Sequence, residues 1–262
     1  MIARVLTVAG SDSSGGAGIE ADLKTIAALG GYGCTAITGL TAQNTLGVQA
    51  VHPVPASFVG RCIRAVVSDI GVDAIKLGML TNAEIIHDVA NALPANVPLV
   101  LDPVMLSTSG AALLPEDAIT SLITRLIPRA SLVTPNLPEA AKLTGLPVAS
   151  SAQRQKAGEA LLALGAQAVL IKAGHDTDDK LTDLLITPTG MVGITLPRLH
   201  SRHTHGTGCT LSAAIATLLA QKMALEPACK EARAYLQAAI ASAPGLGAGH
   251  GPVNHNVSPR RG

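Results

Sequence analysis

The chain has 262 residues, with 19 Lys and Arg against 18 Asp and Glu and a formal net charge of +1. A chain this close to neutrality has no global field that would gather nucleic acid or an anionic membrane, so a polyanionic ligand must be bound by local groups. Aromatic residues make up 1% of the chain and hydrophobic types 48%. This composition excludes stacking platforms for single-stranded nucleic acid, and it excludes disorder over most of the length.

The cysteines and the apolar runs indicate the compartment. Cys34, Cys62, Cys209 and Cys229 show neither a metal-binding nor a disulfide-scaffold spacing. No stretch supplies 18 uninterrupted apolar residues, and the apolar run near the N-terminus is too short for a secretory signal. We therefore expect a cytoplasmic protein with reduced thiols and no membrane partner.

Strand and helix patterns alternate along the first two thirds of the chain. Short aliphatic runs that favour strands occur at 4–9, 34–40, 73–77, 97–101, 131–134 and 168–172. Helical patterns lie between or beside them, at 16–29, 56–68, 82–93, 115–126, 137–143 and 152–164. The alternation predicts an α/β fold around a mainly parallel sheet, and the apolar run VPLVL at 97–101 favours a sheet covered on both faces.

The pattern changes after residue 172. Runs at 181–187 and 191–196 flank Pro188-Thr-Gly190, which predicts an antiparallel hairpin at one edge of the sheet. Two long helices follow, over about 207–222 and 226–243. We expect a single domain over 1–245 and a loop or tail over 246–262.

Polar residues follow the predicted strands, at the edge where open parallel sheets bind ligands. The first such loop, Gly10 to Gly18, has two interpretations: close backbone approach to a small ligand with Asp12 as a polar contact, or a turn that caps the next helix. Its GxGxxA pattern does not predict a dinucleotide site, because no acid lies between Asp22 and Asp69 to hold the ribose. A GxxxxGK[ST] phosphate loop is also absent from the sequence.

The segment His205-Gly-Thr-Gly-Cys-Thr opens a helix of small residues. The backbone N–H groups of Gly206, Thr207, Gly208 and Cys209 would form an anion hole at the positive end of the helix dipole, suited to a transferring phosphoryl group. The same field would lower the pKa of Cys209 toward a thiolate. The alternative is a cap that buries a small residue.

Two further groups of residues point to metal chemistry. Asn136 and Glu139 stand at i and i+3 where a helix begins, and Asp102 follows another strand; together their oxygens suit Mg²⁺, although each alone also fits a cap or a turn. The histidines at 200, 203 and 205 lack a supporting zinc motif, and a loop beside a phosphate site explains them better.

Several motifs in register resemble those of the ribokinase-like vitamin kinases, and among them the hydroxymethylpyrimidine/phosphomethylpyrimidine kinases of thiamine biosynthesis. The matching blocks span nearly the whole chain and include AGSDSSGGAGIEADLKT (9–25), GLTAQNT (39–45), KLGML (76–80), DPVM (102–105), TPNLPEA (134–140), HGTGCTLSAAIA (205–216) and GHGPVNH (249–255). The resemblance implies a three-layer α/β/α sandwich. It also implies ATP-dependent phosphorylation of 4-amino-5-hydroxymethyl-2-methylpyrimidine and then of its monophosphate.

The resemblance further implies roles for individual residues. Gln43 would recognise the pyrimidine, and Asp12, Gly10 and Met79 would complete the substrate pocket. Cys209 would receive or relay the substrate proton. Residues 206–209, Thr207 included, would stabilise the γ-phosphoryl group. Asn136, Glu139 and Asp102 would hold Mg²⁺, and Lys172, Gly174 and His175 would bind the nucleotide. A monovalent cation is a further cofactor to be tested, and a homodimer is implied by the family alone.

Some positions depart from the family pattern. Thr108 stands where a lid lysine is expected after DPVM, which bears on the second phosphorylation because a lysine there would neutralise phosphate charge. Two other functions remain to be tested. One is a vitamin B6 kinase that acts on pyridoxal, and the other is a pyrimidine-binding or thiol-sensing module that does not transfer a phosphoryl group.

Overall fold

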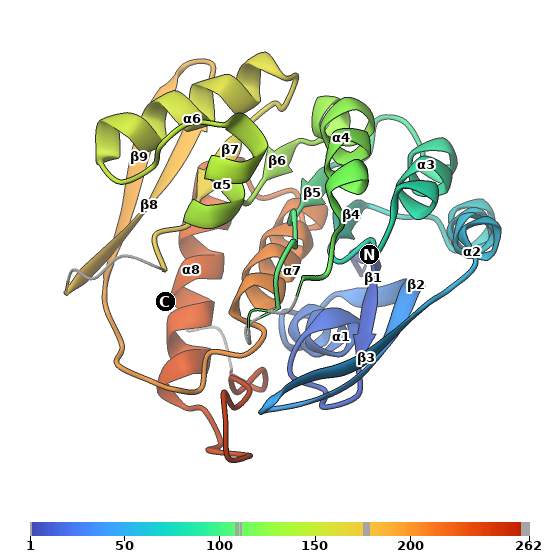
Figure 1. Cartoon of the computed structure of the whole chain (residues 1–262), viewed down its shortest axis with the longest axis horizontal. Coiled ribbons are helices and arrows are strands. Elements are labelled where there is room, and N and C mark those ends of the chain that lie inside the picture. Colours follow the sequence, from blue (N-terminus) through green and yellow to red (C-terminus); the bar gives the residue numbers. More distant parts are fainter. Residues whose placement is uncertain (1, 108–109, 111, 175–178, 258–262) are drawn as a thin grey trace.

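The computed structural model describes residues 2–107, 110, 112–174 and 179–257. Its centre is a nine-stranded sheet in the order β3-β2-β1-β4-β5-β6-β7-β8-β9 (Figure 1). The six strands from β2 to β7 pair in parallel, and the pairs at either end are antiparallel. The strands are β1 (Arg4–Asp12), β2 (Tyr32–Asn44), β3 (Gly47–Pro53), β4 (Ala74–Leu77), β5 (Leu99–Leu101), β6 (Leu132–Val133), β7 (Val169–Ile171), β8 (Lys180–Thr187) and β9 (Gly190–Pro197).

Helices cover both faces of this sheet, as the apolar strands predict. Strand β1 shows why, because Leu6 and Val8 pack into one core while Val5 packs into the other. The first core takes side chains from α2 (Ala56–Asp69), α3 (Ala83–Ala92), α4 (Glu116–Arg125), α5 (Leu137–Thr144) and α6 (Ser151–Ala163). The second takes them from α1 (Gly18–Ala28), α7 (Thr207–Ala220) and α8 (Leu225–Ala241). The three-layer α/β/α architecture is confirmed.

The sequence predicts the strands at one edge of the sheet correctly and those at the other edge only in part. The hairpin of β8 and β9 is present as expected. The second predicted strand, at 34–40, ends too early, because β2 continues to Asn44 and pairs with β3. Strand β3 is almost entirely exposed, so it carries no apolar run that would have revealed it.

The C-terminal stretch over 246–257 contains no helix or strand, yet it packs against the rest of the molecule. Val253 and His255 are buried. The N–H of His250 donates to the carbonyl of Thr45 at 2.9 Å, and the N–H of His205 donates to the carbonyl of Gly251 at 3.1 Å. This stretch thus connects the β2–β3 hairpin with the start of α7. Among the described residues, no helix is long and apolar enough to cross a membrane.

Candidate active site

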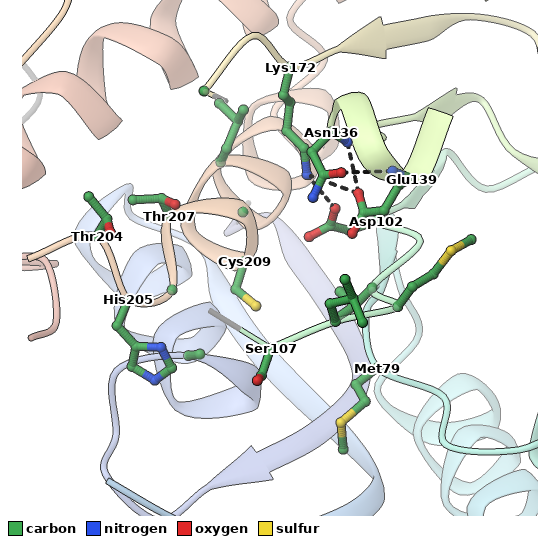
Figure 2. Close-up of a pocket in the computed structure, with 18 of the residues that line it drawn as sticks. Met79, Asp102, Ser107, Asn136, Glu139, Lys172, Thr204, His205, Thr207 and Cys209 are labelled. Atoms are coloured by element: carbon green, nitrogen blue, oxygen red, sulfur yellow. Dashed lines mark hydrogen bonds and ion pairs between the residues drawn. The ribbon is translucent and has the colours of Figure 1, made fainter. Parts of the chain in front are cut away.

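A cavity of about 920 Å³ opens at the carboxyl ends of the parallel strands, beside the start of α7 (Figure 2). This is the edge at which the sequence placed its candidate residues. All of the described candidates line it: Gly10, Asp12, Gln43, Met79, Asp102, Asn136, Glu139, Lys172, Gly174, Gly206, Thr207, Gly208 and Cys209. Two others, His175 and Thr108, lie outside the described residues.

A buried group of opposite charges occupies one end of the cavity. Asp102 directly follows β5, and its Oδ1 accepts hydrogen bonds from Lys172 Nζ at 2.7 Å and Thr134 Oγ1 at 3.2 Å. Lys172 Nζ also lies 4.0 Å from Glu139 Oε2. Burial acts to lower the pKa of the Lys172 ammonium, but the nearby carboxylates of Asp102 and Glu139 together prevail and raise it. The cavity thus holds an ammonium group at this end, fixed by an ion pair with Asp102.

Asn136 is the N-cap of α5, and Glu139 lies in its first turn. The side chain of Asn136 accepts the N–H of Glu139 at 2.9 Å, and the carboxylate of Glu139 accepts the N–H of Asn136 at 2.8 Å. This capping box fixes both side chains at the N-terminus of the helix. Burial raises the pKa of the Glu139 carboxyl above its usual range, against the pull of Lys172. The residues therefore serve the helix whether or not they also serve a ligand.

Helix α7 begins at a glycine that no other residue could replace without rearrangement. Gly206 has φ of +81°, in the left-handed region, and a Cβ on it would lie 1.8 Å from the carbonyl oxygen of Gly16. The loop after β1 and the start of α7 therefore meet backbone to backbone. This contact places the N-terminus of α7 directly over the cavity.

The predicted anion hole needs one correction. The N–H of Thr207 donates to the carbonyl of Thr204 at 3.3 Å in a turn that leads into the helix, so this amide is already occupied. No backbone hydrogen bond among the described residues uses the N–H groups of Gly208 and Cys209. These two stand in the first turn of α7, where the helix dipole is positive.

The expected ionisation of Cys209 is also corrected. Its thiol faces the cavity (Figure 2), but desolvation by the surrounding protein outweighs the ammonium of Lys76 and raises its pKa to about 11. The helix dipole alone does not make a thiolate here. At neutral pH the side chain is a thiol.

The loop after β1 is organised around Asp12. Its carboxylate accepts the N–H groups of Ser14 at 2.9 Å and Ala17 at 2.9 Å and lies 2.7 Å from Nε2 of His205. Burial acts to raise the pKa of Asp12, but the hydrogen bonds from His205 and Ser14 prevail and lower it to about 2. The carboxylate is therefore ionised and engaged within the protein, so it holds the loop in shape.

Gln43 and Met79 form the opposite wall of the cavity. Nε2 of Gln43 lies 3.2 Å from Nε2 of His205, and Oε1 of Gln43 accepts a hydrogen bond from the hydroxyl of Thr41 at 3.2 Å. Met79 packs flat against Gly10, where a Cβ would lie 2.2 Å from the methionine Cε. An apolar surface and a polar amide thus face the same space.

The sequence missed three contributors to the site. The sequence predicts only a loop beside a phosphate site at His205, but its contact with Asp12 joins segments 193 residues apart. Glu20 accepts the N–H of Asp12 at 2.8 Å. Lys76 is fully buried in β4, and its Nζ lies 2.8 Å from Asp22 Oδ2 in α1, behind Cys209. A lone lysine inside the apolar strand AIKL is the signal that could have revealed this ion pair.

The histidines give no metal centre. Within the part of the chain that the structure describes, no group of three or more His, Cys, Asp or Glu side chains is arranged to hold an ion. His203 instead packs against Gly251, where a Cβ would lie 2.3 Å from its Nδ1.

Comparison with known proteins gives a consistent result. A family model described as phosphomethylpyrimidine kinase matches residues 12–254. The chain is 49% identical over 255 residues to the hydroxymethylpyrimidine/phosphomethylpyrimidine kinase of Salmonella typhimurium, a match that covers 95% of this chain and 96% of that protein.

Solved structures with the same fold include two kinds of kinase. Pyridoxal kinase from Staphylococcus aureus in complex with ADP has a TM-score of 0.92 and 35% identity, over 100% of this chain and 96% of that one. Phosphomethylpyrimidine kinase from Clostridium difficile has a TM-score of 0.80 and 41% identity, over 90% of this chain and 98% of that one.

Proposed function

The chain belongs to the phosphomethylpyrimidine kinase family, and on this basis we propose that it phosphorylates 4-amino-5-hydroxymethyl-2-methylpyrimidine with ATP and then phosphorylates the monophosphate. The observation that carries this proposal is the convergence of the candidate residues on one cavity. A polar amide faces this cavity from one side, while a helix N-terminus and a lysine face it from the others. A volume of about 920 Å³ lies within the usual range for small-molecule sites.

Gln43 reads the pyrimidine ring in this proposal. A side-chain amide offers a donor and an acceptor side by side, and an aminopyrimidine offers the complementary pair in its exocyclic amine and its ring nitrogen. Met79 and Gly10 supply the flat apolar surface on which the ring rests. Asp12 acts indirectly, because its oxygens already hold the loop.

The amides of Gly208 and Cys209 stabilise the γ-phosphoryl group as it moves. The hydroxymethyl oxygen attacks the γ-phosphorus, the bond from that phosphorus to the bridging oxygen of ADP breaks, and the hydroxyl proton passes to the thiolate form of Cys209. Since the thiol is the resting form, this base is available in the minor ionised fraction. The helix dipole and the ammonium of Lys172 stabilise the negative charge on the transferring phosphoryl group.

The donor set at Asp102, Asn136 and Glu139 suits Mg²⁺. All three offer oxygen ligands. Among the described residues, Oδ2 of Asp102 carries only a long contact of 3.4 Å from Ser212, which leaves it acceptor capacity for a hydrated ion. A bound Mg²⁺ would neutralise phosphate charge. The monovalent cation, the homodimer and the cytoplasmic location expected from the sequence stay predictions.

A pyridoxal kinase is the second candidate, because the Staphylococcus aureus enzyme solved with pyridoxal matches the whole of this chain with a TM-score of 0.91. The two functions are separated by kcat/KM for the pyrimidine and for pyridoxal, measured with ATP and Mg²⁺. We expect the pyrimidine to be preferred. Faster turnover of pyridoxal would overturn this assignment while leaving phosphotransfer intact.

A further inference from the structure

The imidazole of His205 links two residues at the pyrimidine end of the cavity. It is 4% exposed, and its Nε2 lies 2.7 Å from Oδ2 of Asp12 and 3.2 Å from the side-chain amide of Gln43. A single ring nitrogen thus touches both the carboxylate that organises the first loop and the amide assigned to the substrate. The function proposed above gives His205 no role.

The protonation of Asp12 and His205 determines which end of the Gln43 amide faces His205. The carboxylate of Asp12 is ionised, since its pKa is lowered to about 2, so Nε2 of His205 carries a proton and donates it to Asp12. A ring nitrogen that donates has no lone pair left. The structure places Nε2 of Gln43 3.2 Å from this nitrogen, which sets two donors against each other. The hydrogen bonds therefore favour the reversed amide, in which the oxygen of Gln43 faces His205 and shares the Nε2 proton with Asp12.

The other end of the amide is compatible with this reversal. The hydroxyl of Thr41 lies 3.0 Å from the carbonyl of Ser11 and 3.2 Å from Oε1 of Gln43, and its one proton can serve only one of them. With the amide reversed, Thr41 donates to Ser11 and accepts from Gln43. The NH₂ of Gln43 faces Thr41. One N–H and one oxygen lone pair remain, and both are directed at the cavity in a fixed order.

The imidazole itself is held in place from several sides. A Cβ on Gly16 would lie 2.5 Å from Cδ2 of the ring, so the glycine leaves just enough room for it. The main chain of His205 donates to Gly251 at 3.1 Å and forms a parallel bridge with Pro252. The ring therefore has little freedom to turn away from Gln43.

We propose that His205 is a positioning residue that sets substrate specificity by holding the Gln43 amide in one orientation. The proposal rests on the proposed function, because it assumes that Gln43 reads the pyrimidine. A fixed amide favours a ligand that places an amine beside a ring nitrogen, as the aminopyrimidine does. Pyridoxal has no exocyclic amine, so the fixed orientation of the Gln43 amide contributes less to its binding affinity.

A double-mutant cycle tests this role, with binding of 4-amino-5-hydroxymethyl-2-methylpyrimidine measured by calorimetry. His205→Phe keeps the ring but removes its donor, and we expect about a tenfold loss of affinity. In the Gln43→Leu background, the same change is expected to cost less than about twofold, because there is no amide left to orient. An equal loss in both backgrounds, or no loss in either, would overturn the proposal.

Further variants separate positioning from folding. His205→Gln restores an N–H near the position of Nε2, and we expect most of the pyrimidine affinity and of the preference over pyridoxal to return. Thr41→Val removes the second partner of the amide without touching His205; it is expected to weaken pyrimidine binding, again only when Gln43 is present. This variant tests the proposal even if His205→Phe does not fold. The exposed His87→Phe is the matched control and should change neither affinity.

Failure of the underlying function would look different. If Gln43→Leu alone leaves the affinity for the pyrimidine unchanged, Gln43 does not recognise the pyrimidine, and the proposed role of His205 is wrong as well. If Gln43→Leu weakens binding but His205→Phe and Thr41→Val do not, only the proposed role of His205 is wrong. Binding of ADP, measured in parallel, is expected to stay within about twofold throughout.

Discussion

Cys209 shows how two local effects compete at one atom. The start of a helix stabilises a thiolate, and the sequence correctly places Cys209 there. Desolvation depends on what surrounds the side chain in three dimensions, and it raises the pKa to about 11. Sequence alone gave the position of the thiol but could not give its charge.

Removing this thiol should therefore affect the chemical step and leave binding in place. For Cys209→Ala we expect kcat to fall at least about a hundredfold, the lower end of the range for a general base, with little change in KM for the pyrimidine. Since the thiolate is the active form, the kcat of the wild type should rise between pH 7 and 9, and the variant should lose this rise. Steady-state kinetics across this range measure both. Near-normal turnover of Cys209→Ala would exclude it as the base.

At the scale of elements, the start of α7 depends on the backbone contact between Gly206 and Gly16. Gly145, which ends α5, makes a matched control: it has φ of +70°, but a Cβ on it would meet nothing within 4 Å. Gly145→Ala should therefore cost only about 1 kcal/mol of unfolding free energy, for the left-handed backbone.

Gly206→Ala should cost clearly more stability than Gly145→Ala, and it should also lower kcat, because the first loop and the start of α7 must separate. Urea unfolding and turnover of the two variants give the comparison. Equal losses in both variants would show that the close approach to Gly16 is unimportant.

The C-terminal stretch over 246–257 gives a prediction about acid. His255 is buried, and desolvation lowers its pKa to about 4 from the usual 6.5. Because the folded pKa is depressed, the unfolded chain binds the proton first, so stability is present above pH 6.5 and is lost as pH falls toward 4. At pH 5 the loss from this one residue is expected to be about 2 kcal/mol.

The comparison is with His255→Leu, which cannot titrate. Chemical unfolding of both proteins at pH 7 and pH 5 should show a smaller acid loss for the variant. The same loss in both would place the acid sensitivity elsewhere in the molecule.

The elements also show where sequence reading succeeds and where it stops. Elements that face the core can be recognised in the sequence, because burial selects apolar residues: β4 lies in a continuous buried run, and α2 has apolar residues at helical spacing. Strand β3 is exposed on almost every residue, so nothing in its composition marks it. The long-range contact between His205 and Asp12 depends on the folding of the whole chain, which periodicity does not encode.

At the scale of the whole molecule, near-neutrality and a phosphate-binding function are compatible because the charges are local. The net charge is +1, yet the ammonium of Lys172 and the N–H groups at the start of α7 line the cavity, where they can serve as local donors to a phosphate. The sheet brings the ends of six parallel strands to one edge, and this topology made most of the site predictable from strand ends alone.

The most direct test of the central claim is to follow the fate of ATP and of the pyrimidine together. The enzyme is incubated with ATP, Mg²⁺ and limiting 4-amino-5-hydroxymethyl-2-methylpyrimidine, and ADP release and product mass are recorded. We predict about two ADP per pyrimidine and a product with the mass of the pyrophosphate, as two successive phosphoryl transfers require. Release of one ADP with accumulation of the monophosphate would contradict the second step, and no ADP release above the level without pyrimidine would contradict the function itself.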